Sequence, residues 1–205
     1  MNRRAALSLA IATLLGAAYG GGLPFGGFGP PAKANPRVAS LRDYSATLHT
    51  NLGDVALDLS PHAAPNAVQT FIRLAQRGAY DGLPVHAIFK DRMIVAGPAK
   101  PDGVESIDHE DSPLTHALGA VAMDRAADGR NTPTRLLLIL SDQTHLDGDY
   151  TVFAEAADGR EVLRRIASTP TRPKQGAPAP IEDIVIERVT VTRKKAEDST
   201  QTTDR

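Results

Sequence analysis

Cysteine and tryptophan are absent from this 205-residue chain, and aromatic residues make up only 4% of it. Without cysteine, disulfides and thiol chemistry are excluded, and composition leaves the redox compartment open. Charge is nearly balanced, with 23 basic and 24 acidic residues and a net charge of −1. A chain with neither a basic excess nor many aromatic side chains is poorly suited to nucleic acid. We therefore expect no nucleic-acid partner.

No acidic residue precedes Asp43. Arg3 and Arg4 come before the apolar run Ala5–Ala18, and a segment rich in Gly and Pro follows. This order of positive charge, apolar run and small residues is typical of an export signal. We predict that residues 1–34 are a signal peptide, which places the mature protein in the periplasm or outside the cell.

An uncleaved membrane anchor is the alternative for the same segment. Residues 5–25 would then attach the protein to the membrane, although the clean apolar run is shorter than the roughly 20 residues that a span needs. Beyond it we assign residues 35–42 to a linker, 43–193 to one folded domain and 194–205 to a disordered polar tail. We expect this protein to be a monomer.

Alternating apolar residues predict a β-hairpin at the start of the domain. Residues 44–50 and 55–59 alternate, and Asn51 and Gly53 lie between them. A helix is predicted over about Pro65–Gln76, because Pro suits a first turn and apolar residues then recur at helical spacing.

The remaining predicted elements are short strands, one further helix and long turns. The strands are Val85–Phe89, Met93–Ala96, Ala120–Met123, Leu136–Leu140, Thr151–Ala154 and Ile184–Val191, the last with a bulge near Arg188. The second helix is expected near Arg160–Ala167, and Thr169–Pro180 is predicted to be a loop. Many short strands with two helices indicate a closed barrel.

The histidines show no paired ligand spacing, and the acidic residues of 102–111 lack the order of a calcium loop. We therefore expect no metal and no cofactor.

The stretch Thr47–Gly97 resembles the opening half of a cyclophilin, the β-barrel family of peptidyl-prolyl isomerases. The hairpin Thr50–Asp54, the helix after it and the link Gly78–Gly82 carry this resemblance. Downstream, Leu146–Phe153 reads LDGDYTVF, where many bacterial members have LDGKYTVF. The resemblance implies a mainly β fold: a closed eight-stranded antiparallel barrel capped by two helices.

The family's catalytic Phe-His-Arg segment corresponds to Val85-His86-Ala87. The resemblance thus implies an isomerase that binds proline-containing segments and needs no cofactor, but its principal catalytic Arg is Ala87 here. We expect weak activity and name no certain catalytic residue. Arg92, five positions further on, is a candidate substitute.

The resemblance also places the substrate pocket. It puts Val95 and Arg135 at the family's two glutamines, and Asp124 at the start of the family's Ala-Asn-Ala segment. The residues expected to bind substrate are Met93, Arg125, Ala126, Leu137, His145, Leu146 and Tyr150.

Three hypotheses remain open for function. The first is a weak isomerase that acts on exported polypeptides. The second is a binding module that holds proline-containing segments without turning them over. The third is a scaffold that uses the outer surface of the barrel.

Overall fold

The computed structural model describes residues 40–41, 44–98, 103–174 and 176–193. The strands are β1 (Tyr44–Thr50), β2 (Gly53–Leu59), β3 (Leu83–Phe89), β4 (Met93–Ala96), β5 (Ala120–Arg125), β6 (Asn131–Ile139), β7 (Thr151–Asp158), β8 (Thr171–Lys174), β9 (Ala177–Pro180) and β10 (Val185–Arg193). The helices are α2 (Pro65–Ala75), α3 (Arg160–Ala167) and the short 3₁₀ helix η1 (Thr144–Leu146).

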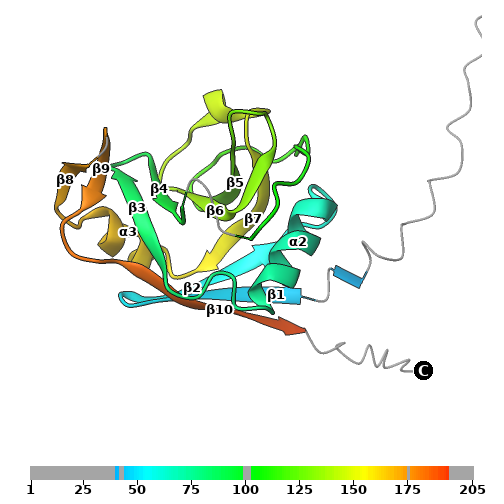
Figure 1. Cartoon of the computed structure of the whole chain (residues 1–205), viewed down its shortest axis with the longest axis horizontal. Coiled ribbons are helices and arrows are strands. Elements are labelled where there is room, and N and C mark those ends of the chain that lie inside the picture. Colours follow the sequence, from blue (N-terminus) through cyan, green and yellow to red (C-terminus); the bar gives the residue numbers. More distant parts are fainter. Residues whose placement is uncertain (1–39, 42–43, 99–102, 175, 194–205) are drawn as a thin grey trace, which may run out of the picture. The chain divides into compact units, whose positions relative to one another are not determined.

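Within the described residues, eight strands close into an antiparallel barrel in the order β1-β10-β3-β4-β6-β5-β7-β2 (Figure 1). This confirms the predicted fold class. The first hairpin turns where Thr50 pairs with Gly53. On the other side of β1, the pairing moves from His49 with Arg188 to Thr50 with Ile186, which confirms the bulge predicted near Arg188.

The two α-helices lie on different sides of the barrel, with α2 near β1 and α3 near the β8–β9 hairpin (Figure 1). Pro65 occupies the first turn of α2, as the sequence indicates. The side chain of Ala64 cannot cap this helix, so Glu110 does so from a distant loop. Its carboxylate accepts hydrogen bonds from the backbone N–H groups of Asn66 at 3.2 Å and Ala67 at 3.0 Å. A carboxylate at this end is favoured by the helix dipole.

The barrel interior holds the main apolar core. The ring of Phe71 from α2 lies 5.1 Å from both Tyr80 and Phe153, measured between ring centroids. All three side chains are fully buried. The Tyr80 hydroxyl donates to the carbonyl of Pro133 at 2.9 Å, so its one polar group is satisfied. Burial raises the pKa of Tyr80 far above its ordinary value.

The structure corrects the prediction of a loop over Thr169–Pro180. Strands β8 and β9 form a separate two-stranded hairpin there, with Thr171 paired to Pro180 and Lys174 to Ala177. The prolines had suggested an irregular segment, but an isolated two-stranded hairpin has a free edge on each strand. Proline is tolerated on such edges because no ladder hydrogen bond is lost.

Strand β6 also begins earlier than the predicted Leu136. Its first residues Asn131, Thr132 and Thr134 are polar, so hydrophobic patterning missed them, yet all three are buried. Asn131 Nδ2 donates to Thr151 Oγ1 at 2.8 Å. For Asn131, a tertiary hydrogen bond accounts for the burial of a polar side chain.

The predicted signal peptide or anchor, the linker and the polar tail lie outside the described residues, apart from residues 40–41. In the part of the chain that is described, no helix has the length and apolar character needed to cross a bilayer. The same residues contain no group of three or more His, Asp or Glu side chains placed to bind a metal.

Candidate functional site

A continuous row of apolar residues crosses the outer face of the barrel. The strand registers pair Ala87 with Val95, Val95 with Leu137, Leu137 with Ala122, and Ala122 with Val152. The row therefore spans β3, β4, β6, β5 and β7. Outer faces of antiparallel sheets are usually polar and solvated. An apolar row on this face therefore indicates either a binding surface or a surface covered by another part of the protein.

These residues form a second apolar cluster, distinct from the barrel interior. Its buried members are Ala87, Val95, Ala120, Ala122, Leu137, Ile139 and Val152. Half-buried apolar side chains pack around them: Phe89, Met93, Leu114, Tyr150 and Ala177. Among the residues predicted to bind substrate, the cluster thus brings together Met93, Leu137 and Tyr150.

The other predicted substrate residues do not belong to this cluster. His145 and Leu146 belong to η1, with His145 exposed and Leu146 half-buried. Arg125 is exposed at the end of β5. Its Nε donates to the Gly129 carbonyl at 2.9 Å and its Nη1 to the Asp149 carbonyl at 3.4 Å. Arg125 therefore ties the turn containing Ala126 to the segment beside Tyr150.

Arg92 lies in the turn between β3 and β4, beyond the pair that Phe89 forms with Met93. It is exposed, and its Nε donates to Gln143 Oε1 at 3.4 Å. The guanidinium is thus directed toward the end of β6 rather than along the row to Ala87. A substitute role for Arg92 stays a prediction that this geometry does not favour.

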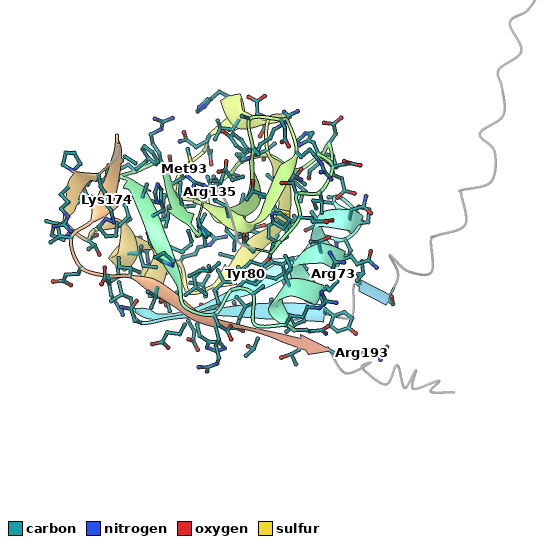
Figure 2. All side chains as sticks on the ribbon, viewed as in Figure 1. Arg73, Tyr80, Met93, Arg135, Lys174 and Arg193 are labelled. Atoms are coloured by element: carbon teal, nitrogen blue, oxygen red, sulfur yellow. The ribbon has the colours of Figure 1, made fainter. Side chains whose placement is uncertain are left out.

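Arg135 is the cation that lies closest to the row along β6, two residues before Leu137 on the same strand face. Its Nε is 2.6 Å from Asp124 Oδ2, and 15% of its side-chain surface is exposed. Arg135 and Met93 are both labelled in Figure 2. From sequence, Arg135 replaces a family glutamine and was considered for a contact in the groove, but burial of its guanidinium depends on the sheet register and could not be predicted.

His86 occupies a bulge in β3, because Val85 pairs with Ala96 while Ala87 pairs with Val95. Burial lowers the pKa of His86 below its usual value, and the positive charges of Arg135 and Lys174 lower it further. His86 also lines a cavity of about 110 Å³ with Arg172 and Lys174 of the β8–β9 hairpin. Sequence reasoning missed this wall of the site because it treated the hairpin as a loop.

A second cavity of about 160 Å³ opens at the other end of the row. Leu114, Ala120 and Val152 contribute to its lining. The second cavity thus adjoins the row at Val152, and the first is lined by His86, the chain neighbour of Ala87. An extended peptide laid over the apolar face would find side-chain room at each end.

Residues 45–191 match the sequence profile of a family described as cyclophilin type peptidyl-prolyl cis-trans isomerase/CLD. This chain belongs to the cyclophilin-type family. Peptidyl-prolyl cis-trans isomerase B of Streptomyces anulatus is 34% identical over 169 residues, which cover 71% of this chain and 95% of that protein. Peptidyl-prolyl cis-trans isomerase-like 2 of Gibberella zeae is 32% identical over 71% of this chain, but the match spans only 26% of that longer protein.

The structural comparison leads to the same family. A crystal structure of a cyclophilin type isomerase from Cryptosporidium parvum, obtained in the presence of the dipeptide Ala-Pro, has a TM-score of 0.64 and 25% sequence identity. The similarity covers 72% of this chain and 98% of that one. The family assignment from sequence is thereby confirmed, together with the cyclophilin barrel.

A hydrogen-bonded pair beside the pocket, formed by the buried His116 and the exposed Asp147, was missed by sequence reasoning. Asp147 Oδ1 accepts hydrogen bonds from the His116 backbone N–H at 2.8 Å and from His116 Nδ1 at 2.7 Å. The His116 ring also meets Tyr150 edge-on at 6.2 Å between ring centroids. Because the two residues are 31 positions apart, no local sequence pattern could predict that they would meet.

The bonds from His116 hold the pKa of Asp147 below its ordinary value. A carboxyl with a lowered folded-state pKa contributes stability above its unfolded pKa of about 4, and this stability is lost as the pH falls below that value. We expect Asp147→Asn to lower the free energy of unfolding at pH 7 by about 0.5 kcal/mol, because solvent screens the exposed carboxylate. The difference from wild type should shrink below a pH of about 4.

Urea unfolding of both proteins from pH 7 down to pH 3 measures this dependence. Glu182→Gln is a suitable control because Glu182 is exposed and carries no such bond in the described structure. A difference between wild type and Asp147→Asn that stays constant down to pH 3 would contradict the role given to Asp147.

Proposed function

We propose that this domain binds proline-containing segments of exported polypeptides on the outer face of its barrel and isomerises them slowly. The observation that carries the proposal is the apolar row that has Ala87 at one end, where the family's catalytic Arg is expected. The apolar part of a proline site is present, while the guanidinium on β3 is missing.

The chemistry explains why this combination would be slow. Rotation about a peptide bond faces a barrier of about 18–20 kcal/mol, because the nitrogen lone pair is delocalised into the carbonyl. A catalyst holds the proline ring in an apolar pocket and directs a donor at the prolyl nitrogen of the twisted form. Loss of that donor from its place on β3 is expected to reduce the rate by about two powers of ten, or about 2.7 kcal/mol.

The residues of the apolar floor support binding. Leu137 and Val95 are buried in the middle of the row, and Met93 and Tyr150 are half-buried beside them. The Cryptosporidium parvum structure was obtained in the presence of Ala-Pro, which makes a short peptide that contains Ala-Pro a suitable first probe. Export of the domain is inferred from residues 1–34 alone and awaits cell fractionation.

A binding module without turnover is the second candidate, and the absence of Arg at position 87 favours it. The two candidates share the groove and differ only in catalysis. Family membership supports retaining slow isomerisation as the first choice, because the barrel, the apolar row and the loops around it are all in place.

We therefore expect this protein to bind a proline-containing peptide but to isomerise it slowly. We expect an acetylated Ala-Ala-Pro-Phe peptide to shift NMR signals around Leu137 and Tyr150, while exchange spectroscopy gives a kcat/KM about one hundred-fold below that of an ordinary cyclophilin. The exchange assay needs no coupled protease.

Each result has a distinct meaning. Turnover equal to that of an ordinary cyclophilin would contradict the importance given to Ala87. Binding with no turnover would select the binding module. Absence of both would leave the outer face without the proposed role.

A further inference from the structure

The guanidinium of Arg135 has an unusual environment for a buried cation. Within the described part of the chain, neither Nε nor Nη1 has a hydrogen-bond acceptor, although both atoms are buried. The Nε atom is only 2.6 Å from Asp124 Oδ2, so the two groups attract each other without a well-directed hydrogen bond. A buried donor without a partner costs about 1–3 kcal/mol, so its presence calls for an explanation.

The position of Arg135 suggests what the missing partner is. On one side lies Gly97 at the end of β4, since a Cβ built at Gly97 would be 3.3 Å from the Arg135 Cα. On the other side lies Asp124 of β5. Arg135 therefore occupies the next step of the outer face after the row that contains Leu137.

The charge of Arg135 affects the pKa of a residue on each side of the site, His86 and Tyr150. It helps to lower the pKa of His86 on β3. Burial and the charges of Asp124 and Asp149 raise the pKa of Tyr150, and the charge of Arg135 acts against them. A peptide lying over the apolar row between His86 and Tyr150 would thus pass this guanidinium.

We propose that Arg135, supplied by β6, is the guanidinium that binds a backbone carbonyl oxygen next to the proline of the bound segment. This inference rests on the proposed function, because it assumes that a proline-containing segment occupies the outer face. A carbonyl oxygen is the acceptor that any peptide offers, and the planar fork of Arg can direct two N–H groups at it.

Asp124 is a positioning residue in this arrangement. Its Oδ1 accepts a hydrogen bond from the Arg125 backbone N–H at 2.9 Å, while Oδ2 faces Arg135. The carboxylate is therefore held between the two arginines. It fixes the guanidinium by charge, and the 15% of the Arg135 side-chain surface that is exposed is the part that can meet the peptide.

The same contact accounts for slow rather than absent catalysis. A cationic donor near the carbonyl and the prolyl nitrogen stabilises the twisted form, in which the lone pair is localised on nitrogen. Arg135 comes from β6, two strands away from Ala87 in the order β3-β4-β6. It therefore approaches the amide from a different direction than a residue on β3 would.

The test is Arg135→Gln, which introduces the family's residue at this position. We expect its Kd for the acetylated Ala-Ala-Pro-Phe peptide to rise about tenfold, with a loss of kcat/KM of at least the same size. The free energy of unfolding should change little, because the loss of the positive charge that faces Asp124 offsets the removal of buried N–H groups without acceptors. Arg135→Lys keeps the charge but loses the planar fork, so it should restore only part of the binding.

Arg164→Gln is the matched control, because Arg164 is exposed on α3 and takes no part in the outer face. Equal peptide affinity of wild type and Arg135→Gln would overturn the inference while the proposed function stands. Loss of binding only in proportion to unfolded protein would also overturn it, since Arg135 would then be a structural partner of Asp124. A wild type that binds no peptide would overturn both.

Discussion

Ala87→Arg is expected to raise kcat/KM for an Ala-Pro peptide at least tenfold, which corresponds to about 1.4 kcal/mol of transition-state stabilisation. Ala87 belongs to the outer apolar cluster and pairs with Val95. Its neighbour Ile88 is buried in the interior cluster, so the register of β3 directs residue 87 outward. A guanidinium introduced there would lie where the family carries its principal catalytic group.

Two features of the structure limit this gain. Ala87 is only 1% exposed, so a long side chain must pass the half-buried Phe89 and Ala177 that pack on the same cluster. Arg135 also places a positive charge on the same face. The double variant Ala87→Arg, Arg135→Gln removes this repulsion and restores both family residues, so its rate should exceed that of Ala87→Arg alone.

The sign of the Arg135→Gln effect is the sharpest part of this prediction. Arg135→Gln should lower kcat/KM in the wild-type background, because it removes the guanidinium donor. It should raise kcat/KM in the Ala87→Arg background, because it removes the repulsion between two guanidinium groups. Exchange spectroscopy of the four proteins measures this cycle. If Ala87→Arg leaves the rate unchanged in both backgrounds while all four proteins remain folded, the importance given to position 87 is wrong. If Arg92→Gln abolishes wild-type turnover, Arg92 is the substitute instead.

Gly97→Ala should destabilise the barrel by more than about 3 kcal/mol. Gly97 has a φ of +88°, which disfavours a side chain. An added Cβ would also collide with the Thr134 carbonyl oxygen and lie 3.1 Å from its carbon. Because both are backbone atoms of β6, a rotamer change cannot relieve the contact. The strands β4 and β6 would have to separate beside Arg135.

Gly148→Ala separates the cost of a positive φ from the cost of a collision with β6. Gly148 has a similar φ of +82°, but an added Cβ there would meet no atom within 4 Å. This control should cost only the conformational penalty of about 1–2 kcal/mol. Urea unfolding followed by circular dichroism gives both free energies. Equal losses for the two variants would contradict the close approach of β4 and β6 at Gly97.

Local sequence patterns, together with the family resemblance that they carry, were sufficient to predict the barrel. Alternation in β1 and β2, the helical spacing after Pro65 and the LDGDYTVF segment are properties of neighbouring residues, so they can be recognised without coordinates. The residues that resemble the family's pocket were found in the same way. Met93, Leu137 and Tyr150 do share one apolar cluster.

Long-range pairing escaped this reasoning, because it depends on register and not on the residues next in sequence. His116 meets Asp147 across 31 positions. Glu110 caps α2 from 44 positions beyond Asn66. The polar start of β6 was missed because Asn131, Thr132 and Thr134 are polar yet buried, and hydrophobic patterning does not detect buried polar residues.

The sequence by itself determined that position 87 holds Ala in a cyclophilin-type barrel, since this follows from residue identity and order. Which cation remains beside the apolar row was decided only by the tertiary structure. Arg92 is the substitute that the sequence suggests, but its side chain bonds to Gln143, whereas the sheet register places the mostly buried Arg135 next to Asp124. The physical reason is that burial of a charge depends on neighbours brought together by strand pairing, and those neighbours come from β4 and β5.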